Sequence, residues 1–156
     1  MTALMSVEGV LRNALGEPIQ EGFKLFRTLV VSYRVVLSST MNAQELEHFV
    51  KRNYLFDYGN LLSSEDFYEG QPLRMRHLDL SRQEGKLELF IDADPDMCAQ
   101  ALAQSVPSIL FTTPKYFQAH RHIKPWGVIT EEQQRQKELV AEKYIQYING
   151  EGKRWE

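Results

Sequence analysis

Residues 2–11 of the chain read TALMSVEGVL, a short apolar run that breaks off at an acidic residue and a glycine. The run over residues 2–7 predicts a buried strand, and Gly9 predicts a tight turn directly after it. Ser6 and Glu8 then stand at the carboxyl end of that strand. In open α/β sheets, ligands bind beyond the carboxyl ends of the strands. We therefore expect an α/β domain with a site at this end of the first strand.

The rest of the chain alternates between predicted strands and predicted helices. Further strands are expected at residues 33–37, 58–62, 86–91 and 108–111. Helices are expected at residues 19–31, 42–50, 72–82 and 95–103. Such alternation is typical of β-α-β units, in which a parallel sheet carries helices on both faces. It predicts a three-layer α/β/α Rossmann-like domain with a mostly parallel sheet.

The length of the chain, 156 residues, fits one domain with a sizeable core. We expect a single domain over residues 1–156 whose core spans residues 2–111. An aromatic and basic segment over residues 112–128 and a polar C-terminal helix over residues 130–149 would pack on that core. The aromatic and basic segment either wraps the surface or lines the site, where it would hold a phosphate or a stacked base.

The overall composition limits which classes of protein and which kinds of partner are expected. The net charge of −3 does not indicate nucleic acid as the main partner, although a nucleic-acid partner remains an alternative. Cys98 is the only cysteine, so no internal disulfide forms and a cytoplasmic location is expected. No apolar run approaches the roughly 20 residues of a membrane span, so we expect no membrane partner.

The stretch Ser6-Val7-Glu8-Gly9-Val10-Leu11 resembles the first motif of the haloacid dehalogenase-like (HAD-like) phosphohydrolases, which reads Asp-x-Asp-Gly-(Thr/Val)-Leu. In that family the first Asp is the nucleophile and a magnesium ligand, and the second is the general acid–base. The resemblance places Ser6 in the nucleophile position. It places Glu8 in the acid–base position, which also makes Glu8 a candidate magnesium ligand.

Three further features resemble the family pattern in the same order along the chain. The family has a Ser or Thr after its second strand that contacts the phosphoryl group, and Ser39 matches it. It has a Lys at the helix before its fourth strand, and Arg74 or Arg76 stands there. Its fourth strand ends in acidic magnesium ligands, for which Asp92 is the first candidate and Asp96 the second.

Each of these features also has a purely structural explanation. Hydroxyl residues after the second strand suit a helix cap or a turn. Arg74 would be an ordinary exposed charge on a helix. Asp94 before Pro95 suits a helix N-cap, and Asp96 would favour the positive end of the helix dipole. The two sets of explanations stay open at this stage.

The serine at position 6 changes what the resemblance implies for function. A hydroxyl lacks the carboxylate's metal-binding oxygens and is a weak nucleophile unless a base activates it. The resemblance therefore implies a pseudoenzyme: a HAD-like domain derived from a magnesium-dependent phosphatase, with activity lost or much reduced, that acts by binding a phosphorylated ligand or a protein. The alternatives are an active metal-dependent phosphohydrolase on a nucleotide or nucleic-acid phosphate, and a structural or assembly protein.

The spacing of the motifs leaves no room for a cap domain. Family members insert such caps between the motifs to enclose small substrates, and a capless form leaves the site open. A small, capless chain with altered motifs is similar to HAD-like proteins encoded by tailed phages. If the site is retained, the resemblance implies Mg²⁺ as its cofactor, held more weakly because one carboxylate is missing.

Overall fold

The computed structural model of the protein describes residues 1–113. Its strands are β1 (Thr2–Ser6), β2 (Arg34–Ser38), β3 (Asn60–Leu62), β4 (Leu87–Asp92) and β5 (Ser108–Leu110). Its helices are α1 (Gln20–Leu29), α2 (Ala43–Arg52), α3 (Leu73–Gln83) and α4 (Pro95–Ala103), with a 3-10 turn, η1, at Ser64–Asp66. None of these helices is long and apolar enough to cross a bilayer. The predicted helix over 130–149 and nearly all of the segment over 112–128 lie outside the described residues.

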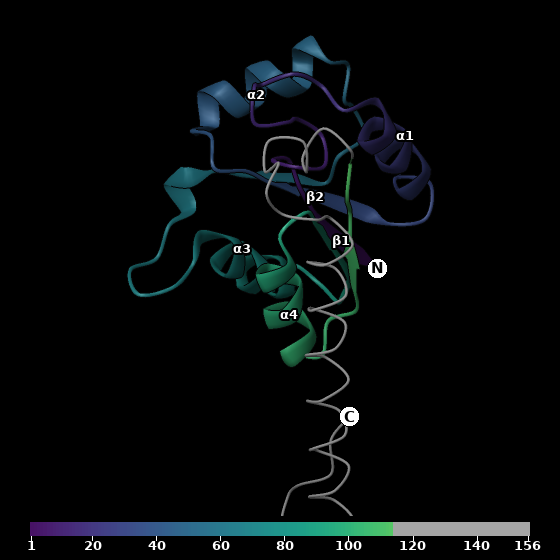
Figure 1. Cartoon of the computed structure of the whole chain (residues 1–156). Coiled ribbons are helices and arrows are strands. Elements are labelled where there is room, and N and C mark those ends of the chain that lie inside the picture. Colours follow the sequence, from purple (N-terminus) through teal and green to yellow (C-terminus); the bar gives the residue numbers. More distant parts are fainter. Residues whose placement is uncertain (114–156) are drawn as a thin grey trace, which may run out of the picture. The chain divides into compact units, whose positions relative to one another are not determined.

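The strands form one five-stranded sheet in the order β3-β2-β1-β4-β5, and every pairing is parallel. The register places Leu4 of β1 between Val36 of β2 and Phe90 of β4. Strand β1 is therefore central, with the next strand in sequence on one side and β4 on the other (Figure 1). This is the reversal of strand order at which α/β sheets open a ligand site.

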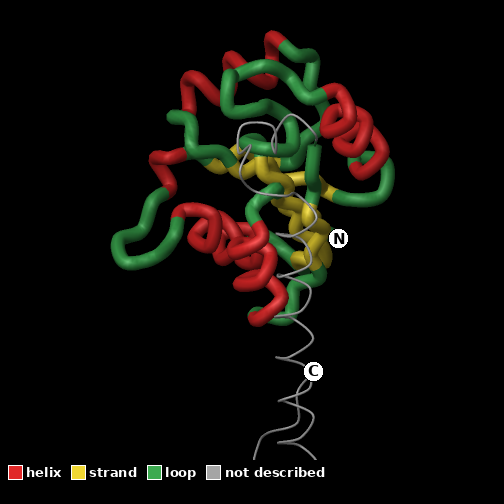
Figure 2. The backbone as a smooth tube through the Cα atoms, viewed as in Figure 1, coloured by secondary structure: helices red, strands yellow, loops and turns green. Residues whose placement is uncertain are grey.

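Alternate residues of the central strands face opposite layers, which produces two apolar cores. Ala3 and Met5 belong to the core with Phe23 and Phe26 of α1 and Leu46 and Val50 of α2. Leu4 belongs to the other core, with Met75 and Leu78 of α3 and Cys98 and Ala101 of α4. Figure 2 shows the helices on both sides of the strands. The expected three-layer α/β/α arrangement is confirmed, and no additional domain is inserted within residues 1–113.

Within residues 1–113 the predicted strands and helices all form, but several boundaries differ by one or two residues. The strand expected at 58–62 begins only at Asn60, because pairing with β2 starts there, opposite Val36. The helix expected at 19–31 ends at Leu29. There the N–H groups of Ser32 and Tyr33 both bond to the Leu29 carbonyl and turn the chain into β2.

Two glycines let the loop after β1 approach its neighbours closely. Gly9 has a φ of +85°, and a Cβ there would stand 2.5 Å from the Ala93 Cβ. A Cβ on Gly22 of α1 would stand 1.7 Å from the carbonyl oxygen of Val10. The loop is thus held between α1 and the end of β4, which fixes where Glu8 lies.

Gly22→Ala is expected to lower the free energy of unfolding by about 2 kcal/mol or more, because neither backbone segment can move without disturbing the core. Gly70→Ala is the control for steric contact: its φ of +85° disfavours a side chain, unlike that of the helical Gly22, but nothing lies within 4 Å of the new Cβ. That control should cost only about 1 kcal/mol. Urea unfolding of both variants measures the difference, and equal losses would contradict this packing argument.

Candidate functional site

An open pocket of 530 Å³ lies beyond the carboxyl ends of β1 and β4. Its walls come from the loop after β1, the first turn of α3 and the turn between β4 and α4. The lining residues include Glu8, Arg12, Thr40, Arg74, Asp92 and Asp94. These segments are distant in sequence and meet because the strand order brings their carboxyl ends together. The pocket is where the reversal of strand order predicts a ligand site.

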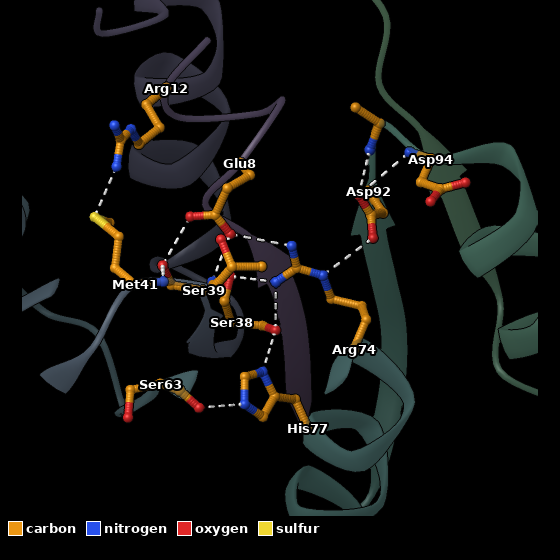
Figure 3. A network of polar contacts seen from close by, with 12 residues as sticks. Glu8, Arg12, Ser38, Ser39, Met41, Ser63, Arg74, His77, Asp92 and Asp94 are labelled. Atoms are coloured by element: carbon orange, nitrogen blue, oxygen red, sulfur yellow. Dashed lines mark hydrogen bonds and ion pairs between the residues drawn. The ribbon is translucent and has the colours of Figure 1, made fainter. Parts of the chain in front are cut away.

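Arg74 lies at the centre of the polar network in this pocket (Figure 3). Its Nη1 donates to the carbonyl oxygen and to the Oγ of Ser38, both at 2.6 Å. Its Nη2 donates to Glu8 Oε1 at 3.1 Å, and its Nε lies 3.3 Å from Asp92 Oδ2. The Arg74 side chain is 10% exposed. A guanidinium presents donors along several directions in one plane, and here it joins the ends of three strands.

Glu8 is held by donors from three directions. Besides Arg74, it accepts from the Ser39 hydroxyl at 2.7 Å and from the Thr40 N–H at 2.9 Å. The Ser39 oxygen in turn accepts from the Met41 N–H at 3.0 Å. Hydrogen bonds to a carboxylate are stronger than neutral ones, so this set fixes the Glu8 side chain. It also commits the Ser39 hydroxyl to an internal partner.

Asp92 ends β4 and is 3% exposed. Its Oδ1 accepts from the N–H groups of Ala93 at 2.7 Å and Asp94 at 3.2 Å. Burial raises the pKa of Asp92, because a charged carboxylate loses its hydration there. Arg74 opposes that increase in pKa, and so do the Ser6 hydroxyl and the two backbone N–H groups. The guanidinium thus favours the charged form of a buried acid.

Ser6 is the last residue of β1 and is fully buried. Its hydroxyl is near enough to Asp92 to favour the charged carboxylate, yet its Oγ has no hydrogen-bond partner of ordinary geometry. Ser6 does not line the pocket. The nearest candidate base in sequence, Glu8, is occupied by Ser39, Thr40 and Arg74. This hydroxyl therefore makes no hydrogen bond of ordinary geometry to a base, although Asp92 is near, and it does not face the pocket.

The residue that sequence reasoning missed is His77, one turn after Arg74 on α3. Its Nδ1 lies 2.5 Å from Ser38 Oγ and its Nε2 lies 2.8 Å from the Ser63 carbonyl oxygen. Burial lowers the pKa of His77 from 6.5 to about 4, so the ring is neutral at pH 7. Because a carbonyl only accepts, Nε2 carries the proton and Nδ1 accepts from Ser38. The i, i+3 spacing of Arg74 and His77 was the available signal.

Five of the six residues predicted from the sequence meet in the structure. Glu8, Ser39 and Arg74 share hydrogen bonds, an ion pair joins Asp92 to Arg74, and Ser6 is buried next to them at the end of β1. Of the two candidate arginines, Arg74 enters this network, whereas the guanidinium of Arg76 lies over the Tyr68 ring at 5.1 Å.

Asp96, the sixth, lies on the exposed side of the first turn of α4 and does not line the pocket. Asp94 takes the structural role considered above, because its side chain accepts from the Asp96 N–H and caps α4. The turn of the helix carries position 96 away from the end of β4. Asp94, which lines the pocket, is the acidic residue that stands beside Asp92 there.

A magnesium ion does not fit the site as it is arranged here. The Arg74 guanidinium lies between Glu8 and Asp92, two of the carboxylates that would hold the ion if the family pattern applied. Among residues 1–113, no three His, Cys, Asp or Glu side chains form a group that could hold a metal ion. Magnesium binding by this chain stays a prediction.

Comparison with known proteins adds no relative: no protein-family model matches the chain, and neither does any curated protein or solved structure. The residues and the geometry of this site are therefore what indicate the function of the chain.

The neutral His77 predicts how stability depends on pH. Between about pH 6.5 and pH 4 the unfolded chain binds a proton that the native ring does not, so the free energy of unfolding falls as pH decreases. The shift corresponds to about 3 kcal/mol across that range. Urea unfolding from pH 7 to pH 4 should show a shallower dependence for His77→Gln than for the wild type.

The raised pKa of Asp92 acts in the opposite direction, but it does so in both proteins, so their difference isolates His77. His48→Gln, at an exposed position on α2, is the control and should retain the wild-type dependence. Parallel curves for wild type and His77→Gln would contradict a buried, neutral His77.

Proposed function

We propose that this chain is a small, capless HAD-like domain derived from a magnesium-dependent phosphatase, that its phosphatase activity is lost or much reduced, and that it acts by binding. The observation that carries the proposal is the state of Ser6. In the family the nucleophile faces the substrate, whereas Ser6 is fully buried, does not line the pocket, and makes no hydrogen bond of ordinary geometry to a base. Loss of a nucleophile usually reduces turnover by several orders of magnitude.

The remaining groups support binding better than catalysis. Glu8, in the acid–base position, already accepts from three donors, which hold its side chain in place and favour its charged form over a proton-donating one. Ser39, in the position that contacts the phosphoryl group, donates its proton to Glu8. What the pocket keeps is an open volume, the Arg12 side chain, and the first turn of α3, which lacks a side-chain cap. An uncapped helix N-terminus and a guanidinium both attract anions.

We therefore propose a phosphorylated ligand or an acidic group of a protein partner as the occupant, in the cytoplasm. A site that is open to one side, with no cap within residues 1–113, admits a phosphate carried on a large molecule. Arg74 offsets the charges of Glu8 and Asp92, so these two carboxylates repel such an anion less.

Catalysis is tested by hydrolysis of a generic aryl phosphate, with and without millimolar magnesium. Wild type is expected to show no turnover above background. Ser6→Asp/Arg74→Lys, which brings back the family's residue types at both positions, is expected to gain magnesium-dependent turnover. Magnesium-dependent turnover by wild type, abolished in Asp92→Asn, would contradict the proposal and favour an active metal-dependent phosphohydrolase.

Binding is tested separately, by the effect of inorganic phosphate on the melting temperature. A ligand that binds only the native state raises that temperature by mass action. Phosphate should stabilise wild type, and Arg12→Gln should lose most of the effect. Arg52→Gln, which removes an exposed positive charge from α2, is the matched control and should keep it. Equal stabilisation of all three proteins would show that Arg12 does not hold the anion.

A further inference from the structure

We infer that the Arg74 guanidinium is the resident cation of this site, standing in the place of a divalent metal between Glu8 and Asp92, and that the native site is therefore independent of metal. This inference rests on the proposed function, which identifies the pocket as a binding site. It adds how the charges of the two carboxylates are neutralised. It also gives a reason why the basic residue is an arginine.

The first support is the position of the guanidinium. Its Nη2 lies 3.1 Å from Glu8 Oε1, and its Nε lies 3.3 Å from Asp92 Oδ2. The two acids come from the β1 loop and the end of β4, and Arg74 joins them from a third segment (Figure 3). A magnesium ion bound to the same oxygens would stand about 2.0–2.1 Å from each and would retain several waters. That volume and the guanidinium overlap, so one excludes the other.

The second support is that Arg74 is held in place from behind. Its Nη1 donates twice to Ser38, and the Ser38 hydroxyl donates onward to the neutral His77 ring. His77 is fixed in turn by the Ser63 carbonyl oxygen. A lysine has one compact ammonium and could not reach Ser38, Glu8 and Asp92 at once. These hydrogen bonds fix the Arg74 side chain within the site, unlike a surface arginine whose side chain is free to move.

The third support is the small number of free oxygens. Glu8 Oε2 accepts from Ser39, and Glu8 Oε1 accepts from Thr40 and from Arg74. Asp92 Oδ1 accepts from two backbone N–H groups, which leaves Oδ2 facing the guanidinium. Position 6, where a third carboxylate would stand, supplies only a hydroxyl. A metal would have to displace Arg74, and it would find one carboxylate fewer than the family pattern supplies.

The inference is tested by titrating the full chain with Mn²⁺, a paramagnetic substitute for Mg²⁺, and following free Mn²⁺ by electron paramagnetic resonance. Wild type is expected to show no binding that depends on Asp92. Arg74→Met keeps the length of the side chain but removes its charge, and should bind Mn²⁺ at least roughly tenfold more tightly than wild type. Arg74→Met/Asp92→Asn should lose that gain.

Arg76→Met is the matched control, because it removes the same charge from the same helix at a residue that lies over Tyr68 and away from the carboxylates. It should behave as wild type. Mn²⁺ binding by wild type that disappears in Asp92→Asn would overturn the inference, and so would a folded Arg74→Met that gains no affinity. If Arg74→Met fails to fold, the titrations of wild type and Asp92→Asn still test the inference. Mn²⁺ binding that depends on Asp92 would overturn it, and the absence of such binding would support it.

The outcomes for metal and for activity are separable. Metal binding by wild type without phosphatase turnover would overturn the resident cation and leave the proposed function in place. Turnover without metal would overturn the proposed function and leave the resident cation in place.

Discussion

The guanidinium of Arg74 is the contact on which the rest of the site depends. It joins Glu8 after β1, Ser38 at the end of β2 and Asp92 at the end of β4, so three neighbouring strand ends are tied by one side chain. Without it, two carboxylates would stand close together with little water to separate their charges, and burial would penalise the ionised form of Asp92. The position of every other polar group in the network follows from satisfying this cation and these two acids.

That contact exists only because the fold places β1 in the centre of a parallel sheet. Strands β2 and β4 lie on either side of β1, and both end at the same edge. Glycine allows the loop after β1 to pass close to α1 and to the start of α4, since no other residue fits against Val10 or Ala93. The loop therefore cannot drift away from the sheet, and Glu8 stays within reach of Arg74. Packing far from the pocket thus sets the distances inside it.

Much of the fold and part of the site could be predicted from the residues. The strand pattern placed Glu8 at the carboxyl end of β1, and the resemblance to the family pattern added Ser39 and Asp92, which follow or end other predicted strands of the same parallel sheet. His77 was missed because a histidine on a helix gives no sign of burial until its neighbours are known. Asp96 was overvalued because three acids in five residues resemble one cluster in sequence, while the turn into α4 sends them in different directions.

The amino-acid sequence by itself determines the alternation of strands and helices, the two apolar faces of the sheet, and the residue types at each strand end. These features follow from local periodicity and turn chemistry. Only the folded chain decides which of the nearby arginines enters the site, whether a serine at a strand end faces solvent, and which acid lines the pocket. Those outcomes depend on helix phase and on competition for hydrogen bonds between segments far apart in sequence. Arg74 faces the carboxylates and Arg76 a tyrosine ring because two residues along a helix point in different directions, and no local pattern shows which direction the sheet occupies.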